Sequence, residues 1–196
     1  MTSNTHIIAL TGGVGSGKSR ILELLKQEYE AKVIQTDLVA KELQEPENPG
    51  FQALVEAFGQ GLVGEDGYLK KAMLTDMVFG DKKARERING LIHPLVWEMV
   101  KKQAQESDCP MVVVESAVLP ENPGDFFDEV WYVYTLKEYR IQRLMKSRGY
   151  SEERCLKIME GQAAEEEFRK AASHVIDNNG SMDDVRRQVA AIMNCR

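Results

Sequence analysis

Short apolar runs alternate with amphipathic segments along this chain. Residues 6–10 form an apolar run that ends at a cluster of glycines, and residues 20–29 then repeat apolar side chains at helical spacing. A second apolar run at residues 32–37 completes a β-α-β pattern, which favours parallel pairing of its strands. Further strands are predicted at residues 111–115, 130–134 and 174–177. Because their continuous Val and Ile suit strands buried on both faces, the pattern predicts an α/β sandwich with a five-stranded parallel sheet.

Two helical segments interrupt this pattern. About seventy residues between the second and third predicted strands carry no strand signal, which is far more than a crossover needs. Proline and glycine divide them into short helices, and His93-Pro94 is expected at an interhelical turn before another amphipathic stretch. A second helical segment runs from residue 136 to about residue 170 and breaks at 149–151, where Ser151 is the expected N-cap. The sequence therefore predicts a helical insert and a helical hairpin.

Composition narrows the class of protein. The 196 residues are 43% hydrophobic and 29% charged, which excludes disordered and low-complexity chains. The net charge of −6 argues against a general nucleic-acid coat and against a polybasic membrane binder. The three cysteines are scattered and lack C-x-x-C spacing, and neither a secretion signal nor a membrane span is visible. We expect a soluble cytoplasmic protein.

A phosphate loop is the strongest chemical signal. Residues 12–19, G-G-V-G-S-G-K-S, match the pattern G-x-x-x-x-G-K-[ST] at the point where a strand meets a helix. Glycines let successive backbone N–H groups point at phosphate oxygens, and the helix adds its positive end. Lys18 would reach the β- and γ-phosphates, and the Ser19 hydroxyl would bind Mg²⁺. The residues expected to surround the phosphates are Gly13, Val14, Gly15, Ser16 and Gly17. The pattern predicts ATP binding, and a plain glycine-rich turn is the alternative.

Two acidic residues are expected on the same edge of the sheet as this loop. Asp37 ends the second predicted strand and Glu115 ends the third. Asp37 would orient and deprotonate an acceptor hydroxyl, or it would cap the helix beginning at Leu38. Glu115 would order a Mg²⁺-bound water, or it would form a structural hydrogen bond to the phosphate loop. Phosphoryl transfer needs little more than such positioning and charge neutralisation.

A basic cluster lies on the first arm of the hairpin. It consists of Arg140, Arg143, Lys146 and Arg148, and residues 137–148 hold five basic side chains against one acidic one. A mobile arm of this kind would close over a triphosphate and neutralise charge on the transferred group. The alternative is a solvated basic face paired with neighbouring glutamates.

Two weaker signals remain. Asn178 and Gly180 follow the last predicted strand and would contact an adenine edge, although Asn-Gly is foremost a turn sequence. His93 would bind a phosphate or a ribose, or it would be a structural histidine that packs the interhelical turn.

These motifs together resemble the dephospho-CoA kinase family. The resemblance runs through residues 8–19, Asp37, His93-Pro94, Arg143, Gln162 and residues 175–181, in the family's order and over nearly the whole chain. It implies a P-loop NTPase three-layer α/β/α sandwich with a helical insert and a helical lid. The implied parts are a nucleotide-binding core of residues 1–38, 108–135 and 171–196, a CoA-binding insert of residues 39–107, and a lid of residues 136–170.

The resemblance also implies a reaction and residue roles. The γ-phosphate of ATP would pass to the 3′-hydroxyl of the ribose of dephospho-CoA, and a Mg²⁺-dependent monomer would do this without nucleic-acid or membrane partners. Residues 15–19 would hold phosphate and Mg²⁺, and residues 178–180 would lie near adenine. The catalytic residues would be Lys18, Asp37 and Arg143, while His93, Arg140 and Arg148 would contact substrate.

Several family features differ in this sequence, and two other functions remain open. The family's D-x-D motif has Gln35 at its first position here, so one carboxylate is missing. The alternatives are another small-molecule P-loop kinase, such as a nucleoside monophosphate kinase, and an ATP-dependent binding switch.

Overall fold

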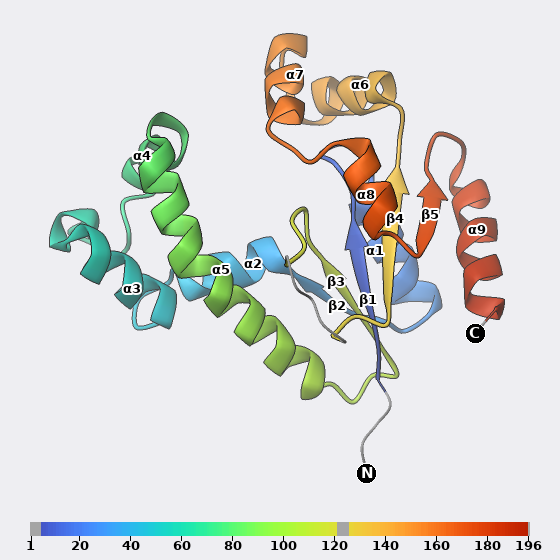
Figure 1. The fold of residues 1–196 in the computed structure, drawn as a ribbon, viewed down its shortest axis with the longest axis horizontal. Coiled ribbons are helices and arrows are strands. Elements are labelled where there is room, and N and C mark those ends of the chain that lie inside the picture. Colours follow the sequence, from blue (N-terminus) through green and yellow to red (C-terminus); the bar gives the residue numbers. More distant parts are fainter. Residues whose placement is uncertain (1–4, 121–125, 196) are drawn as a thin grey trace. The chain divides into compact units, whose positions relative to one another are not determined.

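The structure is a computed structural model that describes residues 5–120 and 126–195 (Figure 1). Its strands are β1 (His6–Thr11), β2 (Lys32–Gln35), β3 (Met111–Glu115), β4 (Glu129–Tyr134) and β5 (His174–Asp177). Its helices are α1 (Lys18–Glu28), α2 (Thr36–Leu43), α3 (Pro49–Phe58), the 3₁₀ helix η1 (Gln60–Leu62), α4 (Lys71–Gly80), α5 (Lys82–Gln105), α6 (Lys137–Arg148), α7 (Glu152–Glu160), α8 (Glu165–Ala171) and α9 (Met182–Asn194). The chain divides into two compact units, Met1–Val33 with Ser107–Arg196, and Ile34–Glu106.

The strands form one sheet in the order β2-β3-β1-β4-β5, with β1 at the centre. The pairs β1–β3, β1–β4 and β4–β5 are parallel, and Leu10 lies opposite both Glu115 and Trp131 in the register. The predicted five-stranded parallel sheet is therefore confirmed. Since all carboxyl ends of parallel strands meet at one edge, the loops after β1, β4 and β5 converge there.

Helices of the first unit cover both faces of this sheet. On one face, buried side chains of α1 and α9 pack against Ile8, Leu10, Trp131 and Ile176. On the other face, the ring of Phe168 in α8 stacks on that of Tyr132, with centroids 5.1 Å apart. This alternation follows from the two-residue period of a strand, which sends neighbouring side chains to opposite faces.

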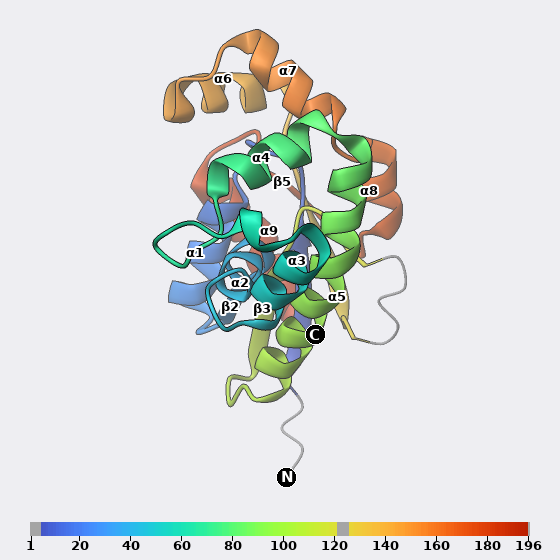
Figure 2. The same ribbon diagram turned by 90° about the vertical axis from the view of Figure 1, so that its left-hand side faces the viewer.

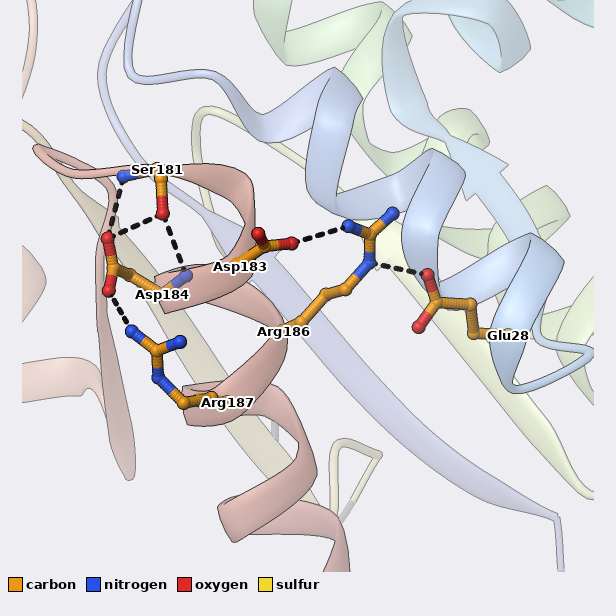
Figure 3. A network of polar contacts seen from close by, with 6 residues as sticks. All are labelled: Glu28, Ser181, Asp183, Asp184, Arg186 and Arg187. Carbon is orange, nitrogen blue, oxygen red and sulfur yellow. Dashed lines mark hydrogen bonds and ion pairs between the residues drawn. The ribbon is translucent and has the colours of Figure 1, made fainter.

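Helix α9 has a complete N-terminal cap and a polar tie to α1 (Figure 3). The Ser181 hydroxyl accepts from the Asp184 N–H at 3.2 Å, and the Asp184 carboxylate accepts from the Ser181 N–H at 2.8 Å. The Ser181 hydroxyl also donates to this carboxylate at 2.7 Å, and this bond, together with the bond from the Ser181 N–H, lowers the pKa of the Asp184 carboxyl. Arg186 donates to Glu28 at 2.8 Å and so joins α9 to α1. The cap fixes the start of α9 directly after the β5 loop.

The second unit is helical and has an apolar core of its own. Helix α5 contacts α2, α3 and α4 (Figure 2). Its buried residues recur on one face of the helix. Pro94 lies inside α5, so the predicted interhelical turn at His93-Pro94 is wrong. A proline inside a helix costs about 3 kcal/mol. The buried positions Ile88, Ile92 and Val96 keep their spacing across it, and burial of this continuous face outweighs that cost.

The second helical segment has three helices where a two-helix hairpin was predicted. Helices α6 and α7 meet at Gly149, whose φ of 65° closes α6, and the predicted N-cap Ser151 accepts from the Arg154 N–H at 3.2 Å. The third helix, α8, begins after the extended residue Ala164 because Phe168 packs on the sheet. Among the residues that the structure describes, no helix is both long and apolar enough to cross a membrane.

Candidate active site

The phosphate loop, residues 12–19, joins β1 to α1. Gly15 and Gly17 have φ values of 77° and 93°, which side chains with a Cβ rarely adopt. A Cβ at Gly17 would also overlap the side-chain amide of Asn178. The first N–H groups of α1, which starts at Lys18, have no acceptor within the helix, and they lie at its positive end. The loop is therefore built to bind an anion.

Lys18 lies across this loop with its ammonium between two oxygens. Its Nζ donates to the Gly12 carbonyl at 2.7 Å and lies 3.4 Å from Glu115 Oε1. The two side chains are only 12% and 14% exposed, so the pair is shielded from water. Glu115 ends β3 as predicted, and its carboxylate contacts the phosphate-loop lysine. A direct role in metal binding stays a prediction for Glu115.

The carbonyl oxygen of Ser16 accepts hydrogen bonds from three side chains. Asn178 Nδ2 donates at 2.7 Å, Thr135 Oγ1 at 2.9 Å and Arg143 Nη1 at 3.2 Å. Ser16, Thr135 and Asn178 are all buried. The segments that follow β4 and β5 are thereby fixed to the phosphate loop. Sequence reasoning missed Thr135, because a single threonine after a strand carries no recognisable pattern.

Arg143 donates hydrogen bonds to backbone carbonyls at the phosphate loop and after β5. Besides the Ser16 carbonyl, it donates through Nη2 to the Asn178 carbonyl at 2.7 Å. Burial lowers the pKa of Arg143, and the positive charge of Arg20 lowers it further. The structure thus brings Arg143 to the phosphate loop, while its predicted action on the transferred phosphate stays a prediction.

Arg140 lies at the tip of the phosphate loop, one turn before Arg143 on α6. Its Nε donates to the Val14 carbonyl at 2.9 Å, and its Nη2 donates to Gln162 Oε1 at 2.8 Å. A Cβ at Gly13 would overlap the guanidinium, so the glycine makes room for it. Burial lowers the pKa of Arg140, whereas the nearby charges of Tyr132 and Glu165 raise it. Two of the predicted lid arginines are therefore in contact with the loop.

The rest of the basic cluster lies further along α6. Lys146 and Arg148 are exposed, and the Arg148 guanidinium lies 6.0 Å from the centre of the Tyr150 ring. The Tyr150 ring is also 4.0 Å from the guanidinium of Arg154 on α7. A substrate contact by Arg148 stays a prediction.

The segment after β5 is held by hydrogen bonds to its own turn and to the β4 loop. Asp177 accepts from the Asn179 N–H at 2.9 Å, and Asn179 Oδ1 accepts from the Leu136 N–H at 2.8 Å. The side-chain N–H of Asn178 is directed at the Ser16 carbonyl. A Cβ at Gly180 would overlap the Asp184 carboxylate of the α9 cap. The predicted adenine contact of Asn178 and Gly180 is not tested by these bonds and stays a prediction.

Asp37 and His93 belong to the second unit. Strand β2 ends at Gln35 and α2 begins at Thr36, so the prediction that Asp37 ends the strand is wrong. The N-cap of α2 is Gln35, which also excludes the alternative of Asp37 as that cap. Helix α2 starts early because burying Thr36, Val39 and Leu43 requires helical spacing. Asp37 is exposed in the first turn, where a carboxylate is favourable.

His93 lies in the continuous helix α5 and is exposed. The alternative of a structural histidine that packs an interhelical turn is therefore wrong, because this position has neither the turn nor the burial. An acceptor-side role for His93 stays a prediction.

Comparison with known proteins identifies the family. The family model described as dephospho-CoA kinase matches residues 6–184, which include the phosphate loop, the whole second unit, helices α6–α8 and the β5 loop. The chain belongs to the dephospho-CoA kinase family. The dephospho-CoA kinase of Carboxydothermus hydrogenoformans is 34% identical, over 95% of this chain and 92% of the relative. That of Symbiobacterium thermophilum is 36% identical, over 95% of this chain and 79% of the relative.

Solved structures share the fold of this chain. A crystal structure of a protein from Thermus thermophilus matches with a TM-score of 0.82 and 29% identity, and it covers 97% of both chains. A dephospho-CoA kinase from Campylobacter jejuni matches with a TM-score of 0.69 at 22% identity, over 96% of this chain and 95% of that one. A shikimate kinase from Acinetobacter baumannii matches with a TM-score of 0.56 at 13% identity, over 99% of this chain and 96% of that one. Because their sequence identities are low, the latter two structures show the fold alone. The predicted P-loop kinase fold and the predicted family are both confirmed.

Proposed function

We propose that this chain is a dephospho-CoA kinase, which transfers the γ-phosphate of ATP to the 3′-hydroxyl of dephospho-CoA and forms coenzyme A and ADP. The observation that carries the proposal is the family match, which spans the phosphate loop, the second unit and the arginine-bearing helix α6. A phosphate loop alone is shared by kinases with many acceptors. Acceptor choice resides in the helical insert, which here falls within the matched residues.

The chain's own residues would hold ATP by charge and by backbone N–H groups. Residues 15–19 offer the N–H groups of the loop and of the first turn of α1 to the phosphates. Lys18 would turn its ammonium from the Gly12 carbonyl and Glu115 toward the β- and γ-phosphates. Arg140 and Arg143 already lie on the loop and would offset the negative charge of the triphosphate.

The residues near Lys18 also fit a magnesium ion. Ser19 supplies a hydroxyl and Glu115 a carboxylate, and hard oxygen donors of this kind suit Mg²⁺. Within residues 5–120 and 126–195, no group of three or more His, Cys, Asp or Glu is arranged to hold a metal ion. Mg²⁺ is commonly bound through one or two carboxylates together with substrate phosphates. When bound, the ion would neutralise charge on the β- and γ-phosphate oxygens.

Asp37 is the proposed base of the reaction. Its exposed carboxylate would accept the proton of the ribose hydroxyl as that oxygen bonds to the γ-phosphorus, and the bond between this phosphorus and the β-γ bridging oxygen breaks. His93 and Arg148 are the proposed further contacts to the acceptor. Since Gln35 is neutral, Asp37 carries this role without a second carboxylate two residues before it.

Mass spectrometry of the product tests the proposed function. The protein is incubated with ATP, Mg²⁺ and dephospho-CoA, and in parallel with adenosine monophosphate or shikimate as acceptor. We expect dephospho-CoA alone to gain one phosphoryl group. No gain under conditions where calorimetry shows ATP binding would overturn the proposal, and phosphorylation of another acceptor would replace it.

Two substitutions separate binding of ATP from chemistry. Lys18→Ala should abolish both turnover and tight ATP binding, whereas Asp37→Asn should abolish turnover and leave ATP affinity largely intact. Lys26→Ala, which removes an exposed lysine from the last turn of the same helix α1, is the matched control and should keep full activity. Activity near the wild-type level in Asp37→Asn would remove the base assignment.

A further inference from the structure

Gln162 holds the phosphate loop and a lid arginine with one oxygen atom. It lies between α7 and α8, and its Oε1 accepts from the Val14 N–H at 3.0 Å and from Arg140 Nη2 at 2.8 Å. Both partners are donors, so the carbonyl end of the amide must face them. Gln162 is one of the residues that carry the family resemblance, which assigns it no role, and it is 148 residues from Val14 along the chain.

A third hydrogen bond completes the arrangement. Arg140 Nε donates to the Val14 carbonyl at 2.9 Å, so the N–H of Val14 is bound by Gln162 and its carbonyl by Arg140. The guanidinium lies where a Cβ on Gly13 would be. Each of Arg140, Val14 and Gln162 is therefore hydrogen-bonded to the other two, and the three bonds form a ring at the tip of the loop. This set fixes the guanidinium in position and in plane.

We propose that Gln162 is a positioning residue that holds the Arg140 guanidinium at the phosphate loop, ready for the polyphosphate of ATP. An arginine side chain has several rotatable bonds, and a free one would lose that freedom only when ATP binds. A guanidinium that is held beforehand avoids this cost at the moment of binding. The inference rests on the proposed function, because it assigns Arg140 to the substrate ATP.

The neutral charge of Gln162 is part of the argument. A glutamate at this position would accept the same two hydrogen bonds, and it would also neutralise the positive charge of Arg140. A glutamine fixes the guanidinium and leaves its charge for the phosphates. Two substitutions of Gln162 can therefore separate its hydrogen bonds to the Arg140 guanidinium from the effect of the charge on that guanidinium.

Calorimetric titration with ATP and Mg²⁺ tests the proposal without an acceptor. We expect Gln162→Met, which keeps the length and removes the oxygen, to raise the Kd for ATP about tenfold, as the loss of a hydrogen bond to a charged group implies. Gln162→Glu should keep or raise the melting temperature and should still weaken ATP binding. The control Gln142→Met changes an exposed glutamine of α6 and should bind ATP like the wild type.

A double-substitution cycle shows whether the effect passes through Arg140. Arg140→Met should weaken ATP binding, and adding Gln162→Met to it should cost less than about threefold more. A wild-type Kd in Gln162→Met, an unchanged Kd in Gln162→Glu, or a full tenfold effect of Gln162→Met on top of Arg140→Met would each overturn the proposal. Because these titrations contain no acceptor, their failure is distinct from the failure of the dephospho-CoA assay.

Discussion

Replacing Thr135 with valine tests how the phosphate loop is held at Ser16. The substitution keeps the branched shape of the side chain and removes only its hydroxyl group. In the structure this hydroxyl lies 2.9 Å from the Ser16 carbonyl and 2.8 Å from the Tyr134 carbonyl, and its single hydrogen serves one of them at a time. Thr135 is buried, so water cannot replace the lost bond easily.

The expected cost is that of one neutral hydrogen bond. Ser16 keeps two donors after the change, Asn178 Nδ2 at 2.7 Å and Arg143 Nη1 at 3.2 Å. Arg143 loses only a long contact of 3.4 Å to the hydroxyl and keeps its bonds to two carbonyls. Since no buried polar group is left without a partner, the free energy of unfolding should fall by about 1 kcal/mol, within a range of roughly 0.5–1.5.

Urea unfolding followed by circular dichroism measures this change. The control is Thr75→Val on α4, where an exposed hydroxyl donates to the Lys71 carbonyl at 2.8 Å, and it should change the free energy by less than about 0.5 kcal/mol. A loss of about 3 kcal/mol in Thr135→Val would show that the three donors act as one unit and refute independent bonds. A loss no larger than that of the control would refute any contribution of the hydroxyl.

Three further predictions concern α9 and α6. Ser181→Ala removes the N-cap of α9 and should cost about 1 kcal/mol, or about 2–4 °C in Tm by scanning calorimetry; an unchanged Tm would contradict it. Because its pKa is lowered in the folded state, Asp184 stabilises the fold above its ordinary pKa, and this contribution is lost as the pH falls below about 4. The difference in stability between wild type and Asp184→Asn should therefore shrink toward low pH, and a difference that grows there would refute the assignment. Leu144→Ala truncates a side chain that is 2% exposed and close to Gly15, and urea unfolding should show a loss of about 2–5 kcal/mol, against little change in the control Met145→Ala.

The fold could be predicted where each element has a strong local pattern. Strands β3 and β5 agree with the predicted residues, because the apolar residues of each strand end at an acidic one, Glu115 in β3 and Asp177 in β5. The phosphate loop was predictable for a similar reason, since the positive φ angles that require its glycines are set by the backbone of a few neighbouring residues. In both cases the interactions that determine the structure lie within a few residues of one another in the sequence.

Predictions failed where packing of a whole helix face outweighed a local signal. Pro94 indicates a break, yet α5 continues because its buried face extends on both sides of the proline. Asp37 follows an apolar run, yet the residues from Thr36 onward bury better as a helix than as a strand. A single sequence shows both signals but gives no measure of which one contributes more free energy.

The contacts that fix cations on the phosphate loop could not be predicted, because they depend on individual atoms brought together by the completed fold. Gln162 reaches Val14 and Arg140 only once the connection between α7 and α8 lies over the loop. No period or spacing in the sequence marks such an encounter, and a glutamine between two helices is ordinary. The basic cluster on α6 was visible from composition, but its division into arginines that touch the loop and basic residues that stay exposed was not. Arg140 and Arg143 are three residues apart and share a helix face, but the exposed Lys146 is also three residues from Arg143, so only the completed fold decides which side chains of α6 meet the loop.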